Sequence, residues 1–176
     1  MNIFCEQNQS DYVQMDCGID QAGIVAVGFI DTTVTTPTKV NLESEGWWTN
    51  LLAQSPPQLH VATKTRGEYP GGTPTEEDGF GKESTQVTGA AHEATIEFEG
   101  IDDNRLFVEG INSKKWKMAF ITNGGKGIYI DAPVTPYGKL NVPRGITTAA
   151  FWMMTLKWQS FENPVVFDAP DNIFDE

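Results

Sequence analysis

Alternation of polar and apolar residues predicts two half-exposed β-strands. Between residues 88 and 100, every second position from Glu93 to Glu99 is a glutamate or threonine, and the positions between them are mostly apolar. Residues 59–66 alternate in the same way. A side-chain period of two places one set on each face of a strand. We therefore expect amphipathic strands over both segments.

Other strands are predicted from apolar runs and turn signals. Residues 23–30 form a short run rich in β-branched residues, and residues 147–160 begin apolar on both faces, as in a central strand. Residues 116–120 alternate, and the tract NGGK at 123–126 is typical of a tight hairpin turn. Residues 127–131 are then expected to return as the partner strand.

Two short helices complete the predicted fold. Residues 41–53 combine the capping residues Asn41 and Ser44 with an apolar face, and Pro56-Pro57 ends the pattern. A second helix is expected to start at Asp102 or Asp103 and to run through Val108. Together these elements predict a mainly β (α+β) single domain over residues 1–176, built as an antiparallel β-sandwich or partly closed barrel.

Two segments lack a place in this core. Residues 67–81 contain five Gly, two Pro and three consecutive acids, which predicts a long loop projecting between the two amphipathic strands. Residues 164–176 are expected to form an extended C-terminal arm whose apolar residues lie on a neighbouring copy. The subunit-interface candidates are Glu68, Tyr69, Pro70, Glu76, Glu77, Asp78, Phe80, Phe167 and Phe174.

Charge argues against several partners. The formal net charge is −12, so the protein repels polyphosphate and anionic lipid. No apolar run approaches membrane-spanning length, and the chain is expected in the cytoplasm when made. Cys5 and Cys17 offer no metal or redox spacing, and sequence leaves open whether they are reduced thiols or a disulfide. We expect no membrane partner and no tight nucleic-acid binding.

The candidate chemistry is sparse. The histidines are His60 and His92, on strands that can pair, and a cross-strand contact is the simpler interpretation than a catalytic base. No zinc-type spacing is present, and the acidic run 76–78 lacks the pattern of a calcium loop. We therefore predict no catalytic residues, no metal and no cofactor.

The order of features over residues 23–160 resembles that of the tail-tube proteins of tailed bacteriophages and related injection machines. The features are a strand, a capped helix, a strand, a Gly/Pro/acid loop, an amphipathic strand, a short helix, a hairpin and a long last strand. The resemblance is architectural, without a residue motif. It implies a ring of six copies, with residues 67–81 reaching the adjacent ring and inner strands lining a channel. The channel-lining candidates are Glu93, Thr95, Glu97 and Glu99, which would give the channel an acidic wall that repels DNA.

From this resemblance we expect a structural protein of the virion, present in the host cytoplasm during assembly. Its expected role is a tail-tube or head-tail connector protein that binds itself and other virion proteins and lets DNA pass without adhesion. A stopper or capsid decoration protein stays an alternative. A carbohydrate- or host-binding β-sandwich module is the second hypothesis, and a small hydrolase is the third.

Overall fold

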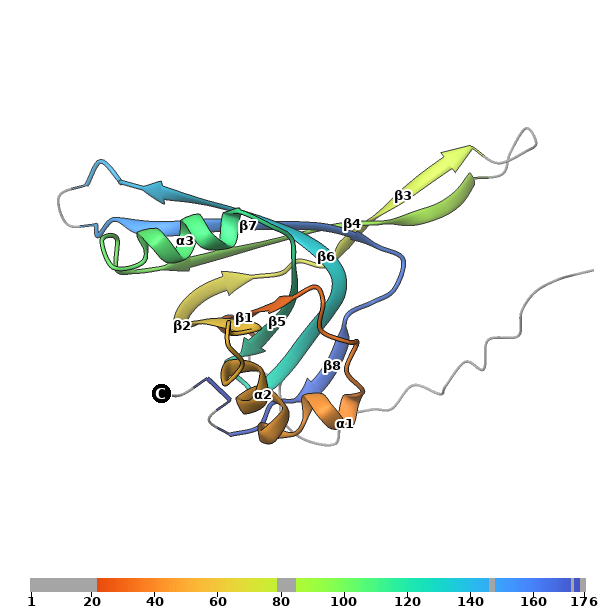
Figure 1. Ribbon diagram of the computed structural model, residues 1–176. Coiled ribbons are helices and arrows are strands. Elements are labelled where there is room, and N and C mark those ends of the chain that lie inside the picture. The colour runs from red at the N-terminus through yellow and green to blue at the C-terminus, as the bar shows by residue number, and fades with distance from the viewer. Residues whose placement is uncertain (1–21, 79–84, 146–147, 172, 175–176) are drawn as a thin grey trace, which may run out of the picture.

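The computed structural model describes residues 22–78, 85–145, 148–171 and 173–174. Within these residues, eight strands form one sheet, accompanied by three short helices (Figure 1). The strands are β1 (Ile24–Asp31), β2 (Leu59–Glu68), β3 (Gly72–Asp78), β4 (Thr85–Phe98), β5 (Trp116–Thr122), β6 (Lys126–Asn141), β7 (Phe151–Ser160) and β8 (Val165–Asp168). The helices are α1 (Lys39–Leu42), α2 (Glu45–Leu52) and α3 (Arg105–Asn112). The predicted mainly β fold class is confirmed.

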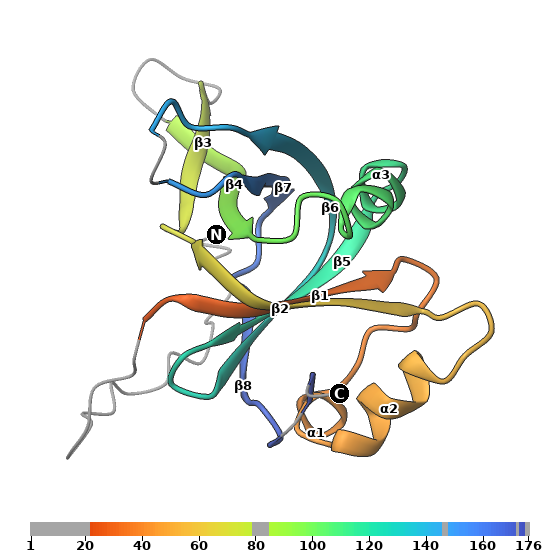
Figure 2. The same ribbon diagram turned by 90° about the vertical axis from the view of Figure 1, so that its left-hand side faces the viewer.

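The sheet is antiparallel and curls back on itself. Its strand order is β2-β1-β5-β6-β7-β4-β3, with β8 beside β6. A short additional pairing joins β2 to β4 (Figure 2). In this pairing Arg66 lies opposite Glu97 and Glu68 lies opposite Thr95. Strand β6 pairs with β5 and β8 in its first half and with β7 in its second half. The result is a sandwich-like sheet that is not a clean barrel.

Two hydrophobic clusters stabilise this sheet. The inner cluster lies between the facing parts of the curled sheet and α3. The outer cluster lies between the sheet strands β1, β5, β6 and β8 on one side and α1, α2 and the chain after β8 on the other. Large side chains buried almost completely in the inner cluster are Phe29, Met118, Phe120, Met154 and Leu156. Large side chains buried almost completely in the outer cluster are Ile30, Leu42, Trp48, Leu59 and Phe167.

The helices differ from the predicted ones in their bounds. The single helix expected over 41–53 is two helices, because Ser44 has an extended backbone and begins a second one. The indole Nε1 of Trp48 donates a hydrogen bond to the carbonyl oxygen of Leu42 (2.8 Å), which fixes the angle between the two. The helix expected from Asp102 or Asp103 begins later, at Arg105, and continues to Asn112 because Ile111 joins Val108 in the inner cluster.

The prediction of an extended C-terminal arm over residues 164–176 is wrong for the residues of this segment that the structure describes. Strand β8 pairs with β6, and Phe167 is 1% exposed in the outer cluster. Phe174 packs against the same cluster, with its ring centroid 5.8 Å from that of Trp48. The expectation that Phe167 and Phe174 cover a neighbouring copy fails because the chain itself supplies an apolar surface for both.

The segment predicted as a loop over 67–81 is mostly strand. Gly72–Asp78 forms β3, which pairs with β4 along its whole length and projects from the body as a two-stranded hairpin (Figure 1). Backbone pairing supplies the order that side-chain burial does not. Phe80, the rest of the hairpin end, Cys5 and Cys17 lie outside the described residues.

Candidate functional site

The projecting β3–β4 hairpin is the part of the described structure least engaged with the body. Residues 85–89 of β4 pair with β3 alone, and β3 has β4 as its one described neighbour. The described side chains from Thr73 to Glu77 are exposed, including the interface candidates Glu76 and Glu77, and Val87 is 51% exposed. The backbone groups on the outer edge of β3 therefore remain available to another strand.

The root of this hairpin is firmly packed. The hydroxyl group of Tyr69 lies 2.7 Å from Nδ1 of His92, and the His92 ring stacks on Trp158 with a centroid distance of 5.0 Å. Burial raises the pKa of Tyr69 above its usual value. Tyr69 packs against the inner cluster, so the structure places this interface candidate in a contact within the chain, whereas Glu68 and Pro70 are exposed.

The outer face of β2, β4, β7 and β6 carries most of the channel-lining candidates. Directly paired residues of antiparallel strands share a face. Glu93 lies opposite Lys157, with 3.1 Å between its Oε2 and the lysine Nζ, and Glu97 lies opposite Arg66. Glu99 follows the end of β4. Three carboxylates and three cations share this face: Glu68, Glu93, Glu97, Arg66, Lys139 and Lys157.

The balance of charge on this face differs from the expected acidic wall. The candidates along β4 predicted an acidic wall, because the sequence shows their alternation but not the cations that the neighbouring strands place beside them. Thr95 and Thr155 lie side by side between the charged rows, and Tyr137 of β6 adjoins Thr155. These hydroxyl groups are polar but uncharged. Because the three carboxylates equal the three cations in number, the named residues together carry no formal net charge.

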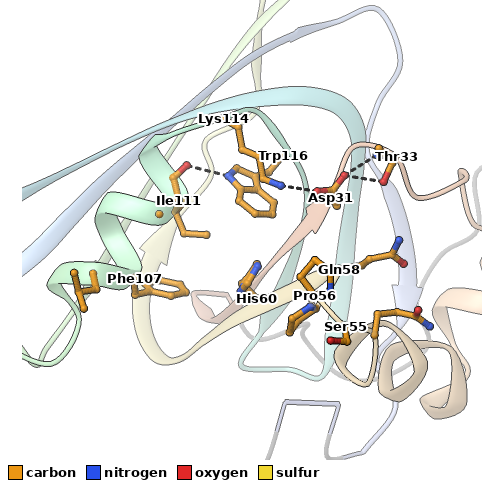
Figure 3. Close-up of a pocket in the computed structure, with 14 residues that line it drawn as sticks. Asp31, Thr33, Ser55, Pro56, Gln58, His60, Phe107, Ile111, Lys114 and Trp116 are labelled. Atoms are coloured by element: carbon orange, nitrogen blue, oxygen red, sulfur yellow. Dashed lines mark hydrogen bonds and ion pairs between the residues drawn. The ribbon is translucent and has the colours of Figure 1, made fainter.

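A cleft of about 550 Å³ opens beside α3 (Figure 3). The turn between α2 and β2, the end of β1 and one side of α3 form its walls, and His60, Phe107 and Trp116 lie among its lining residues. Lys114 Nζ contacts Asp31 Oδ2 at 2.5 Å and lies over the Trp116 ring. The hydrogen bonds from Lys114 and Thr33 lower the pKa of Asp31 to about 2.

The two histidines do not meet. His60 pairs with Phe29 and lines the cleft, whereas His92 lies at the hairpin root. Burial lowers the pKa of His60, and Lys114 adds to this effect. Among the described residues, no hydrogen bond joins His60 to Ser55 or Asp31, and no group of three His, Cys, Asp or Glu residues could hold a metal ion.

A polar network on the outer cluster side was not anticipated; its Lys117 and Tyr129 are buried, and its Asp131 is half-exposed. Lys117 Nζ donates a hydrogen bond to the carbonyl oxygen of Val34 (2.9 Å) and pairs with Asp131 Oδ1 (2.8 Å), which also accepts from Tyr129. Burial raises the pKa of Tyr129, and its bond to Asp131 adds to this. A charged residue at the second position of the otherwise mostly apolar strand β5 was the available signal. The network secures the chain between β1 and α1.

Comparisons with known proteins leave the family open. No protein-family model matches the chain, and no curated protein and no solved structure matches it. Within the described residues, no helix combines the length and apolar character needed to cross a membrane.

Proposed function

We propose that this protein is a structural subunit of a phage virion, a tail-tube or head-tail connector protein that assembles into rings through which DNA passes. The observation that carries the proposal is the β3–β4 hairpin, which extends from the body with exposed side chains and a free strand edge. Other virion proteins and further copies of this chain are the partners proposed.

The energetics of the hairpin favour a partner. An isolated two-stranded ribbon is at best marginally stable in water, and a long uncovered edge invites pairing with another chain. Seven residues of β3 are ordered without burying a described side chain, at a backbone entropy cost of about 1–2 kcal/mol each. A second copy that covers the hairpin would add apolar contacts and backbone hydrogen bonds to offset that cost.

The charge balance of the outer face supports the passage of DNA, because cations that adjoin carboxylates are less able to bind phosphate groups. This effect differs from repulsion of DNA by an acidic wall. Adhesion to DNA grows with each cation that neutralises a phosphate. On the outer face Lys157 forms an ion pair with Glu93, and Arg66 lies directly opposite Glu97, so each of these two cations has a carboxylate residue beside it. A channel wall built from this face would present no surplus cation to hold DNA.

The test is to shorten the hairpin and to measure mass in solution. Thr73 and Ala91 are direct partners, so replacing residues 74–90 with Asn-Gly closes them by a tight turn. We expect the intact chain to form multiples of its 19.4 kDa mass as concentration rises, and the shortened variant to keep the mass of one chain in multi-angle light scattering.

A matched control separates shape from charge. The double variant Glu76→Gln, Glu77→Gln keeps the hairpin but removes two of its carboxylates, and it should assemble like the intact chain. Equal assembly of the shortened variant, or an intact chain that stays a single subunit at every concentration, would contradict the proposal.

The cleft beside α3 favours a second candidate function, a carbohydrate- or host-binding module. Its carboxylate and ammonium neutralise each other, and the side chains of Ser55, Gln58 and His60 make no hydrogen bond among the described residues. Such groups can bind hydroxyl groups of a neutral sugar. Saturable changes in the His60 ring signals on titration with neutral oligosaccharides, at unchanged mass, would favour this function over assembly.

A further inference from the structure

We propose that the Tyr69–His92 contact sets the direction in which the β3–β4 hairpin leaves the body, so that both are positioning residues for assembly. The inference rests on the proposed function for its biological meaning, but the geometry stands by itself. Tyr69 lies in the link between β2 and β3, and His92 lies on β4 opposite Gly72, the first residue of β3. The contact therefore joins the strand that enters the hairpin to the strand that leaves it.

The His92 ring is tightly packed against the backbone of Gly72. A Cβ atom on Gly72 would lie 2.4 Å from Cε1 of His92, so the histidine ring fills the space that a side chain would take. On its other side the ring stacks on Trp158, nearly parallel at an interplanar angle of 4°. His92 is 5% exposed and is held between the hairpin backbone and the inner cluster.

The hydrogen bond adds a fixed orientation to this packing. Nδ1 of His92 lies 2.7 Å from the Tyr69 hydroxyl group, and Nε2 has no hydrogen-bond partner among the described residues. The Tyr69 hydroxyl is thus the single described polar contact of the ring. A buried nitrogen without a partner is costly, so the ring strongly prefers the position that keeps this bond.

A small change of angle at the root displaces the far end of the hairpin by a larger distance, so the root matters for an assembly built on the hairpin. Seven residues of β3 at about 3.3 Å each extend roughly 23 Å, so a tilt of about 10° at the root moves the far end by about 4 Å. Well-packed interfaces match surfaces at the density of a protein interior, and a displacement of that size would separate them. Fixing the root angle is therefore a condition for an interface at the hairpin end.

The experiment measures the hairpin directly in dilute, unassembled protein. Spin labels at Thr75→Cys on β3 and Thr135→Cys on β6 report the hairpin-to-body distance, after the two native cysteines are changed to serine. We expect Tyr69→Phe, which removes only the hydroxyl group, to at least double the width of the distance distribution. Tyr137→Phe is the matched control, because Tyr137 is 63% exposed and its hydroxyl makes no hydrogen bond among the described residues.

A second variant tests whether the two residues act together. His92→Phe keeps a stacked ring but removes the ring nitrogen that contacts the Tyr69 hydroxyl group, and it should broaden the distribution as Tyr69→Phe does. The double variant should be no broader than either single one, because both changes remove the same bond. His92→Asn, which keeps an acceptor near the position of Nδ1, should restore much of the narrow distribution.

The outcomes separate the two proposals. An unchanged distance distribution in folded Tyr69→Phe and His92→Phe overturns the positioning role, whatever the state of assembly. A broadened distribution supports it, and assembly should then weaken by about fivefold, the effect of one lost hydrogen bond of about 1 kcal/mol. Broadening with undiminished assembly supports the claim that the contact sets the hairpin direction, but it contradicts both a role of that direction in assembly and the proposed role of the hairpin in ring formation.

Discussion

The β3–β4 hairpin and the chain from β8 to Phe174 look alike in sequence but behave differently in the fold. Both follow amphipathic strands, and both were predicted to extend toward a neighbouring copy. The hairpin does project, with no buried side chain described between Thr73 and Glu77. The C-terminal segment lies on its own body, where Phe167 and Ile173 are buried.

The difference teaches how apolar residues decide the course of an outlying segment. Phe167 lies opposite Gly127 and stacks near Trp48, with 6.0 Å between ring centroids. A large apolar side chain that finds such a site within its own chain needs no partner. The hairpin offers mostly polar side chains and glycine, and it is held by its own backbone pairing and by its root. The hairpin side chains are therefore exposed in the single chain, and only a partner could cover them.

The largest expected effect tests the C-terminal side of this comparison. Phe167→Ala should lower the free energy of unfolding by about 3–5 kcal/mol, because it removes a fully buried ring and leaves a cavity. Urea denaturation monitored by tryptophan fluorescence measures the loss. Val166→Ala, at a 56% exposed position of the same strand, is the control and should change little. Equal effects of the two variants would show that β8 is not part of the core.

Filling the space beneath the Phe167 ring should have the second largest effect on stability. A Cβ atom on Gly127 would lie 2.1 Å from Cζ of Phe167, and the buried ring has little room to move. Gly127→Ala should therefore lower stability by about 1–3 kcal/mol. Combining it with Phe167→Leu, a smaller side chain, should recover part of the loss. Additive losses in the double variant would argue against this contact.

Shortening the hairpin should cost far less stability. Replacing residues 74–90 with Asn-Gly removes no described side chain that is buried. We expect the free energy of unfolding to change by about 1 kcal/mol or less, as for other changes away from a core. Thermal and urea unfolding of the shortened chain provide the measurement. A loss as large as that of Phe167→Ala would mean that the hairpin belongs to the folding core.

The smallest effect concerns the ion pair between Asp168 and Lys126, which links β8 to β6. The Lys126 hydrogen bond lowers the pKa of Asp168, so the pair stabilises the protein above the usual aspartate pKa and is lost as pH falls below it. Because the carboxylate is exposed, Asp168→Asn should have a barely measurable effect at neutral pH, and salt should remove it. A salt-independent effect would contradict this interpretation.

Sequence patterns predicted the strands that are marked by a local alternation of polar and apolar residues. They failed where contacts between residues far apart in the sequence determine the structure. The glutamate and threonine alternation in β4 is visible in any reading of residues 88–100. The strand β3 contains Pro74 and consecutive acids, so its pairing with β4 outweighs its own weak preference for a strand. The position of Phe167 depends on Gly127 and Trp48, which no local pattern connects to it.

The candidate sites divide in the same way. Glu76, Glu77 and Glu93 lie where their sequence context suggested, on exposed surfaces. Tyr69 does not, because its contact with His92 needs the turn at β3 to bring the two together. The cleft around His60 draws its walls from three separate parts of the chain, so its composition was not visible in sequence.

Electron microscopy of the purified intact chain tests the central claim most directly. We predict closed rings or stacked tubes, because the exposed hairpin edge and its packed root are suited to a repeated contact with another copy. The hairpin-shortened variant should show none under the same conditions. Fields without any regular assembly for the intact chain, at concentrations where light scattering also reports a single subunit, would contradict the account.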